Sequence, residues 1–295
     1  MELDIMSKIA VLVDSSSYIA PADLAALNIY QINDPIMMGE QVFHENESWA
    51  SQEEFYTFQR TAEPALTTSQ PEIGAFMTKF DELAEAGYTD VIVIVLSSGI
   101  SGAFSSLESL AGTVENIKVH VWDSQIAASG AGNQAKLAAE MVAAGKDVQT
   151  ILASLEELRA TTKVLFAVDE IRHLQRTGRI SSGQATLGSL LNIKPLLTFE
   201  DTKIIAIGKE RAMKRAWKKI EADFQAVHDS VDYKIRATIV DGNNPVLADQ
   251  WATDLAELFP DVVVERSIIG PYIGVHTGEK AMGLIWARDY KTLEN

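Results

Sequence analysis

The sequence contains no cysteine among its 295 residues. This absence excludes disulfide bonds, thiolate zinc sites and a cysteine nucleophile, and it fits a reducing compartment. Positive charge is also scarce, because 25 lysines and arginines face 41 aspartates and glutamates, for a net charge of −16. Such a chain repels polyanions and has no counterion-release drive toward DNA or RNA. We therefore expect no nucleic-acid partner.

Long apolar runs and recognisable nucleotide or metal motifs are missing as well. No apolar stretch approaches the roughly 20 residues that a membrane-spanning helix needs. Residues 1–6 lack the basic start and the apolar core of a signal peptide. The five histidines show no metal-ligand spacing, and no Gly-x-x-x-x-Gly-Lys-Ser/Thr loop is present. The sequence predicts a cytoplasmic protein without a metal site.

Apolar strands that alternate with amphipathic helices dominate the first half of the chain. Residues 8–13, 91–96 and 119–122 are mostly apolar, as in parallel strands that are covered on both faces. Helices are expected over residues 73–84 and 127–144, each closed by a nearby glycine. This alternation predicts an α/β fold with a parallel sheet.

The pattern changes in the second half. Residues 196–199 and 203–207 flank Glu200-Asp201-Thr202 as the strands of a hairpin would, which predicts antiparallel pairing. We therefore expect two domains. Residues 1–160 would form a parallel, Rossmann-like three-layer sheet domain, and residues 161–295 a smaller mixed-sheet α/β domain.

Two short patterns are typical of helix starts. Ser51 followed by Glu54 reads as a capping box, in which each side chain satisfies a free backbone donor. Ser69 followed by Glu72 has the same spacing and predicts a second helix start. Residues 34–39, which contain a proline and a glycine, look irregular.

Four hydroxyl-rich loops stand out, and three of them directly follow predicted strands. In an open α/β sheet such loops gather at the carboxyl edge, where ligands bind. Capping of the following helices is the alternative role for each residue taken alone. Neutral hydroxyl donors suit a carboxylate or a sugar better than a triphosphate. The loops are Asp14-Ser15-Ser16, Thr67-Thr68-Ser69, Ser97-Ser98 and Asp123-Ser124.

Further polar candidates lie in the second half. His276 has glycines on both sides, at Gly270 and Gly278, which suggests that the backbone here lies close to another group. A structural role and a ligand role are equally compatible with this pattern. Arg179 and Arg211 belong to two basic clusters that could be solvated surfaces. Their loop-like positions also allow them to fix polar groups near a cleft between the domains.

Two enzyme hypotheses remain open at this point. Ser98 with His276 and either Asp14 or Asp123 could form the triad of a serine esterase, although Ser98 does not lie in a Gly-x-Ser-x-Gly elbow. The stretch 130–135 resembles a dinucleotide fingerprint, but it falls inside an expected helix and no acidic residue follows at the usual distance. We interpret its glycines as helix packing.

Several ordered motifs carry a resemblance to a known family. They are Val13-Asp14-Ser15, Thr67-Thr68-Ser69-Gln70-Pro71, Leu96-Ser97-Ser98-Gly99-Ile100-Ser101-Gly102, Val121-Trp122-Asp123-Ser124, Gly178-Arg179-Ile180, Ile193-Lys194-Pro195, Lys209-Glu210-Arg211, Ile269-Gly270-Pro271 and His276-Thr277-Gly278. Over nearly its whole length the chain resembles the DegV family of bacterial fatty-acid-binding proteins, the acyl-carrying subunits of fatty acid kinase. It departs from the family pattern where Glu279 and Lys280 follow Gly278.

The resemblance implies two α/β domains with a long-chain fatty acid buried between them. Positions Thr68 and Ser98, with Ser97 beside them, would hold the carboxylate. His276, Arg179 and Arg211 would belong to the surrounding polar network. We expect four further residues from the strand-end loops to support this network, namely Asp14, Ser15, Asp123 and Ser124.

The resemblance also implies a carrier rather than an enzyme, with no catalytic residue and no cofactor beyond the bound fatty acid. A separate ATP-dependent fatty acid kinase would phosphorylate the acid for phospholipid synthesis, and the carrier could contact a membrane surface transiently. The helix over residues 73–80 would form a pocket wall. Candidate lining residues, for which core packing is the alternative role, are Phe76, Met77, Phe104, Ile193 and Leu197.

Overall fold

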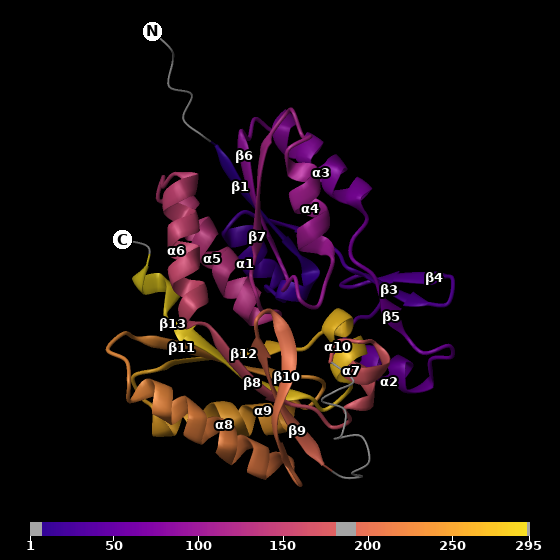
Figure 1. The fold of residues 1–295 in the computed structure, drawn as a ribbon, viewed down its shortest axis with the longest axis vertical. Helices are drawn as coiled ribbons and strands as arrows, with labels where there is room; N and C mark the ends of the chain where they lie inside the picture. The colour runs from indigo at the N-terminus through magenta and orange to yellow at the C-terminus, as the bar shows by residue number, and fades with distance from the viewer. Residues whose placement is uncertain (1–7, 181–192, 294–295) are drawn as a thin grey trace.

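The computed structural model describes residues 8–180 and 193–293 (Figure 1). The first sheet has four parallel strands in the order β2-β1-β6-β7. Because these strands run in the same direction, their carboxyl ends and the loops that follow lie at one edge. The strands are β1 (Ile9–Asp14), β2 (Ile29–Ile32), β6 (Asp90–Val95) and β7 (Lys118–Asp123).

The apolar character of β1 and β6 follows from the layers on both sides of the sheet. Val11 and Ile92 pack into the core under α5 and α6, whereas Leu12 and Val93 pack into the core under α3 and α4. Successive side chains of a strand point to opposite faces, so both faces need apolar residues. The helices are α3 (Ile73–Glu85), α4 (Ala103–Ala111), α5 (Ser129–Ala143) and α6 (Val148–Thr161), with α1 (Pro21–Ala26) beside α5.

The second sheet has six strands in the order β10-β9-β8-β13-β11-β12. All neighbours are antiparallel except β11 and β12, so the sheet is mixed and the expected hairpin of β9 and β10 is confirmed. The strands are β8 (Lys163–Ala167), β9 (Lys194–Glu200), β10 (Lys203–Glu210), β11 (Ile235–Asp241), β12 (Val263–Ile268) and β13 (Met282–Arg288).

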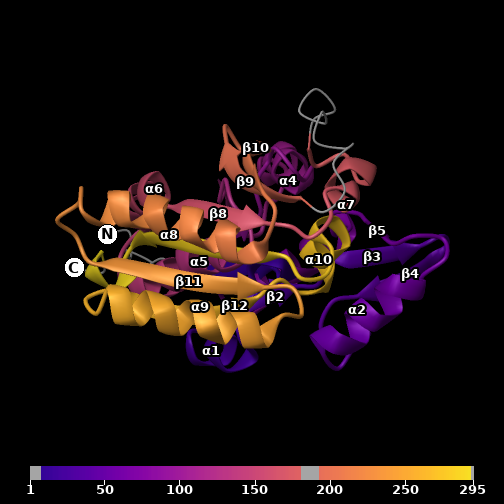
Figure 2. The ribbon, with the colours of Figure 1, turned by 90° about the horizontal axis from the view of Figure 1, so that it is seen from below.

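Two helices, α8 (Met213–His228) and α9 (Pro245–Leu258), cover one face of the six-stranded sheet (Figure 2). Leu165 and Leu284 point into the core beneath these helices. Their neighbours Phe166 and Ile285 point to the opposite face, into a core that includes side chains from the first half of the chain. The α/β architecture with a parallel sheet and a separate mixed sheet is thus as the sequence predicts.

A third, three-stranded sheet was not predicted. It has the order β4-β3-β5, and its strands are β3 (Pro35–Met38), β4 (Gln41–His44) and β5 (Thr67–Thr68). The prediction of an irregular segment over residues 34–39 is wrong, because Gly39, with φ +61°, turns the chain into a β-hairpin. The helix α2 (Gln52–Thr61) follows this hairpin.

The two predicted helix starts have different outcomes. Ser51 accepts a hydrogen bond from the Glu54 backbone N at 3.2 Å, so the predicted cap is confirmed. The predicted cap at Ser69 is wrong, because α3 begins only at Ile73 and the Ser69 hydroxyl donates to the Gln70 carbonyl. Residues Thr67 and Thr68 pair with β3, and this extended pairing delays the helix.

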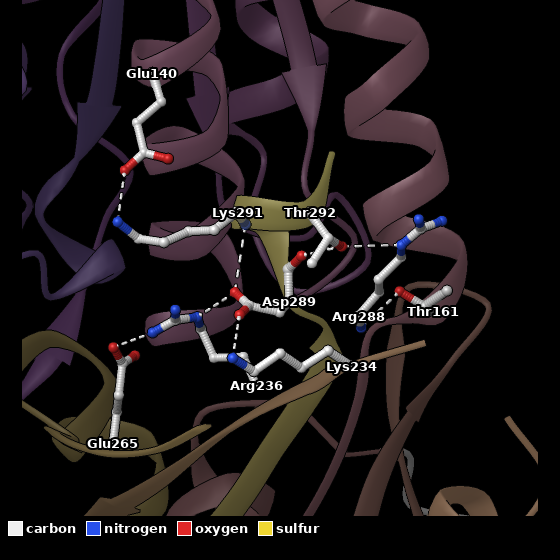
Figure 3. A network of polar contacts seen from close by, with 9 residues as sticks. All are labelled: Glu140, Thr161, Lys234, Arg236, Glu265, Arg288, Asp289, Lys291 and Thr292. Atoms are coloured by element: carbon white, nitrogen blue, oxygen red, sulfur yellow. Dashed lines mark hydrogen bonds and ion pairs between the residues drawn. The ribbon is translucent and has the colours of Figure 1, made fainter. Parts of the chain in front are cut away.

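The first and second halves of the chain are joined at one end by charged side chains (Figure 3). After β13 the 3₁₀ turn η3 (Tyr290–Thr292) packs against the first sheet's core. Across the two halves, Lys291 Nζ lies 3.6 Å from Glu140 of α5, and Arg288 forms an ion pair with Glu157 of α6. Within the second half, buried Arg236 donates through Nε to Asp289 Oδ1 at 2.9 Å. The division into domains at residue 160 stays a prediction.

Among the described residues, no helix combines the length and the apolar character required to span a membrane.

Candidate functional site

A cavity lies between the six-stranded sheet and the loops at the carboxyl edge of the parallel sheet. Its empty volume, counted together with space open to solvent, is about 680 Å³. Strand residues such as Val164, Phe166 and Ile285 form one side, and Leu96, Ile126 and Ala128 from the loops form another. The walls are mostly apolar, so the cavity suits an apolar chain.

The polar residues of the cavity include a group that comes from the second half of the chain. They are Arg179, Tyr272, His276 and Thr277, the last three on α10 (Pro271–Thr277). Thr68 of β5 joins this group, because its Oγ1 lies 2.8 Å from Nε2 of His276. The Tyr272 hydroxyl donates to the Ser69 carbonyl at 3.1 Å. The structure therefore brings predicted residues Thr68, His276 and Arg179 together.

The glycines around His276 serve close packing of α10. A Cβ at Gly270 would lie 2.4 Å from Cε1 of Tyr18, and one at Gly274 would lie 2.6 Å from the Tyr56 hydroxyl. The expectation that the backbone lies close to another group is confirmed, but the groups next to these glycines are the aromatic side chains of Tyr18 and Tyr56. The expected loop is a helix that ends at Gly278, where φ is +74°.

His276 is a buried, neutral side chain. Burial, together with the charges of Arg179 and Arg176 and nearby His173, lowers its pKa to about 3. Its Nδ1 is buried and has no hydrogen-bond partner in the described part of the chain. A histidine with such a low pKa is a poor general base near neutral pH.

Arg179 carries a positive charge that no carboxylate neutralises within residues 8–180 and 193–293. Among the described residues its guanidinium donates only to backbone carbonyls, those of Ile100 at 3.3 Å and Thr177 at 2.6 Å. Arg176 likewise donates to the Leu66 carbonyl at 2.8 Å and forms no ion pair among these residues. The polar end of the cavity therefore favours an anionic group.

The carboxylates at the sheet edge hold the loop after β6. Asp14 Oδ2 accepts a hydrogen bond from Leu96 N at 3.0 Å, and Asp123 Oδ1 accepts one from Ser98 N at 3.1 Å. Since β6 lies between β1 and β7, the loop is held from both sides. These two aspartates position a neighbouring loop, and neither lines the cavity.

Most of the predicted hydroxyls are already engaged. Ser97 donates to the Thr202 carbonyl at 2.7 Å, and Ser124 donates to the Ile126 carbonyl at 2.9 Å. Ser15 contacts two buried carboxyls. Only the half-buried Ser98 among these serines has no side-chain hydrogen bond in the described structure. Ser98 is nevertheless not among the residues that line the cavity.

Several predicted residues lie away from the cavity. Arg211 is exposed and forms no hydrogen bond or ion pair with described residues. Phe76, Met77 and Phe104 pack in the core under α3 and α4, so the prediction of α3 as a pocket wall is wrong. Leu197 is buried near the cavity but does not line it. Ile193 forms the edge of the described part, and its contacts stay untested.

Sequence reasoning missed the wall formed by the six-stranded sheet. Val164, Phe166 and Ile285 alternate with residues that face α8 and α9. The sequence shows that side chains of these strands alternate between two apolar faces. Which of the two faces lines the cavity depends on which face the helices cover. Tyr272 and Thr277 were missed because a helix of seven residues shows no clear periodicity.

Neither enzyme hypothesis finds its geometry. His276 Nε2 contacts Thr68, and its Nδ1 has no carboxylate partner in the described chain, so a triad with Ser98 is not assembled. Gly130 and Gly132 lie within α5, where a Cβ on Gly132 would meet the Ser17 carbonyl at 2.7 Å. The interpretation of these glycines as helix packing is confirmed.

The segment in which the chain departs from the family pattern closes onto α2. Glu279 accepts hydrogen bonds from Arg60 and from Asn243, each at 2.7 Å to Oε1. Lys280 adopts φ +63° directly after it. The substituted loop is thus anchored to the surface beside α10 and leaves the contact of His276 with Thr68 in place.

Comparison with protein-family models matches residues 8–289 to a family described as "Uncharacterised protein, DegV family". Among curated proteins, the chain is 37% identical over 281 residues to a DegV domain-containing protein of Halalkalibacterium halodurans, covering 95% of this chain and 99% of the relative. It is 36% identical over 283 residues to protein DegV of Bacillus subtilis, covering 94% and 98%.

Solved structures of similar fold include two that are described as binding fatty acids. The crystal structure of DegV, a fatty acid binding protein from Bacillus subtilis, has a TM-score of 0.87 at 35% identity, covering 96% of this chain and 99% of that one. A DegV family protein from Thermus thermophilus, described by its fatty acid binding, has a TM-score of 0.87 at 27% identity, covering 95% and 99%.

Proposed function

The chain belongs to the DegV family, and from this premise we propose that it binds a long-chain fatty acid in the cavity between its two large sheets. The acyl chain would lie among the apolar walls, and the carboxylate would lie at the end formed by Arg179 and α10. The observation that carries this proposal is a cavity-lining guanidinium without a carboxylate partner in the described structure.

The acyl chain and the carboxylate make different contributions to binding, as their expected free energies show. Burial of each methylene contributes about 0.8 kcal/mol, so a long acyl chain supplies most of the affinity. A charge-assisted hydrogen bond contributes about 1.5–3 kcal/mol, enough to distinguish a carboxylate from an uncharged head group. The polar residues therefore determine specificity and orientation.

The neutral state of His276 suggests how the carboxylate is held. A neutral ring that carries its proton on Nε2 would donate to Thr68 Oγ1, at the observed 2.8 Å. The hydrogen of the Thr68 hydroxyl is then free to donate to the carboxylate. Ser98, whose hydroxyl has no partner in the described part of the chain, would be the second donor. Arg211 and the other predicted network residues would act indirectly.

The protein would act as a cytoplasmic carrier and present the carboxyl group to a separate ATP-dependent fatty acid kinase. No nucleophile and base are assembled at the cavity among the described residues, which supports a role in binding rather than in catalysis. The acyl phosphate would then serve phospholipid synthesis, with transient contact to a membrane surface. We propose no metal, no further cofactor and no nucleic-acid partner.

Mass spectrometry of the purified protein tests the binding proposal. Protein prepared without detergent and then denatured should release one fatty acid per chain. Delipidated protein should take up added fatty acid. Absence of lipid in the first experiment and absence of uptake in the second would refute the proposal. Phosphorylation of the bound acid by a fatty acid kinase and ATP tests the partner separately.

A further inference from the structure

Three carboxyl groups are buried together beside α10. Asp14 at the end of β1, Asp34 before β3 and Glu45 after β4 have at most 1% of their surface exposed. None of the three forms an ion pair with a lysine, arginine or histidine of the described ranges. Three buried negative charges without a cation are costly, so at least one carboxyl group should be neutral.

The contacts of Ser15 indicate where a proton is held. Its Oγ lies 3.0 Å from Asp34 Oδ2 and 2.7 Å from Glu45 Oε2, and it also accepts from the Asp34 backbone N at 2.9 Å. A serine hydroxyl has a single hydrogen, so it can donate to only one of the two carboxyl groups. The other contact is a hydrogen bond only if that carboxyl group is protonated.

The remaining partners favour the proton on Asp34. Glu45 has donors for a negative charge, because Oε1 accepts from Tyr272 N at 2.7 Å and the Tyr18 hydroxyl also bonds to this carboxylate. Asp34 Oδ2 accepts from Ser16 N at 3.0 Å, whereas its Oδ1 is buried without a partner in the described structure. An unpartnered oxygen is tolerated better on a neutral acid than on a carboxylate.

We propose that Asp34 is held as a neutral carboxylic acid. We further propose that the hydrogen-bond network formed by Asp34, Ser15 and Glu45 positions the residues of the ligand site. The acid donates to Ser15, and Ser15 donates to the Glu45 carboxylate. This inference rests on the proposed function for its link to a ligand, but the protonation of Asp34 stands independently.

Glu45 connects this element to the site through the first turn of α10. It binds the backbone N of Tyr272, and Tyr18 accepts from the backbone N of Ile273 at 3.0 Å. His276 lies one helical turn after Tyr272, on the same face, with ring centroids 6.2 Å apart. A shift of this turn would move His276 away from Thr68. Glu45 is therefore a positioning residue and does not contact the ligand.

Electrostatics support the same assignment. Burial raises the pKa of Asp34 well above its usual value, and the negative charges of Asp14 and Glu45 add to this effect. Burial also raises the pKa of Asp14 to about 6 and that of Glu45 to about 7, so Glu45 carries its full negative charge only above that pH, whereas Asp34 has the additional repulsion of both neighbours. The other titratable groups that face the cluster are phenols, which remain neutral; they are Tyr18, Tyr56 and Tyr272.

Carbon-13 NMR of aspartate-labelled protein tests the protonation directly. One carboxyl signal should have the chemical shift of a neutral acid at pH 7, and it should disappear in Asp34→Asn. The exposed residue Asp232 provides the control, because Asp232→Asn should leave that signal unchanged. A wild-type spectrum in which every aspartate is a carboxylate at pH 7 would overturn the proposal, even if no variant folds.

A variant of Glu45 tests the connection between the two acids. Glu45→Gln removes a negative charge and offers an amide donor to Ser15, so Ser15 can donate to Asp34 and the pKa of Asp34 should fall. The neutral-acid signal at pH 7 should then weaken or vanish. A packing role for Glu45 would leave the signal unchanged, and that result would refute the proposed sequence of hydrogen bonds.

Binding of cis-parinaric acid, followed by its fluorescence, tests the positioning role. Glu45→Leu should bind roughly tenfold more weakly, the loss expected for one buried hydrogen bond, whereas Glu45→Gln, which keeps the acceptor for Tyr272, should bind nearly as wild type. Ser15→Ala replaces Glu45→Leu if that variant does not fold. Equal affinities of the Glu45→Leu and Glu45→Gln variants for cis-parinaric acid would contradict the positioning role of Glu45. If wild type binds no fatty acid while Asp34 is neutral, only the proposed function fails.

Discussion

The two halves of the chain meet at two places with opposite chemistry. At the place drawn in Figure 3, Lys291 of the second half approaches Glu140 of the first, and Arg236 pairs with Asp289 within the second half, so charges of both signs are matched. At the cavity, Thr68 contacts a neutral His276, and within the described part of the chain Arg179 donates only to carbonyls. The same interface is therefore charge-matched at one end and carries an unmatched positive charge at the other.

This difference distinguishes contacts that stabilise the fold from contacts that can bind a ligand. A buried ion pair leaves neither partner free to recognise a ligand, and removal of one partner exposes the other to a large desolvation penalty. A guanidinium that is satisfied only by carbonyls keeps its charge available. We infer that the matched end stabilises the fold, whereas the unmatched end is suited to a carboxylate. The predictions below disturb one end at a time.

The largest effect is expected at the matched end. Arg236→Met should lower the free energy of unfolding by about 3–5 kcal/mol, because buried Asp289 loses its partner. Urea denaturation measures this loss. The double variant Arg236→Met/Asp289→Asn should recover part of the stability, since the buried negative charge of Asp289 is removed and only the partly exposed Glu265 still lacks Arg236. A loss below about 1 kcal/mol would mean that the pair behaves like an exposed one.

At the cavity, the largest effect concerns Arg179. Arg179→Met should weaken fatty acid binding by about 1.5–3 kcal/mol, roughly 10- to 100-fold, because the carboxylate loses a charged donor. Isothermal titration calorimetry measures the dissociation constant. Exposed Arg211 serves as the matched control, and Arg211→Met should change affinity less than about twofold. Equal losses for both variants would indicate a general charge effect.

A smaller loss is expected for Thr68. Thr68→Val keeps the shape of the side chain but removes the hydroxyl that contacts His276, so affinity should fall by about 0.5–1.5 kcal/mol. The adjacent exposed Thr67 provides the control, and Thr67→Val should bind as wild type. Unchanged affinity in Thr68→Val would remove this hydroxyl from the site.

The smallest expected effect concerns the proton NMR signals of the His276 ring, whose chemical shifts should not change with pH. The pKa of His276 is lowered to about 3, so its ring should not titrate between pH 5 and pH 8. His228 should titrate above the usual histidine range, because hydrogen bonds with Asp229 and Asp261 outweigh its burial and raise its pKa. A His276 titration near pH 6.5 would contradict its neutral state.

The same lowered pKa affects stability in acid. Between about pH 6.5 and pH 3 the unfolded chain binds a proton at His276 that the folded chain does not. The free energy of unfolding should therefore fall as the pH decreases through this range, and His276→Gln should reduce the slope of that dependence. Thermal denaturation at several pH values measures it.

Much of the fold could be predicted because local patterns determine it. The apolar strands β1 and β6 and the helices between them follow from periodicity, and the loops after parallel strands must share an edge. The structure brings predicted residues Thr68 and His276 into contact, whereas Ser98 is not among the residues that line the cavity, and the ligand role of all three stays a prediction. The Ser69 cap failed because the pairing of Thr67 and Thr68 with β3 is a tertiary contact.

The remainder of the site depends on packing that no local pattern encodes. Phe166 lines the cavity because α8 and α9 cover the opposite face of its sheet. Asp34 and Glu45 look like ordinary turn and surface residues in the sequence. Only the hairpin of β3 and β4 buries them beside Asp14 and the start of α10.

Calorimetric comparison of a fatty acid with the fatty alcohol of the same chain length tests the central claim most directly. The two ligands bury the same acyl chain but differ in the charge at the head group. If the unmatched Arg179 and the hydroxyl of Thr68 recognise a carboxylate, the acid should bind roughly 10- to 100-fold more tightly in wild type, and Arg179→Met should remove most of the difference. Equal affinities for acid and alcohol in wild type would contradict the account.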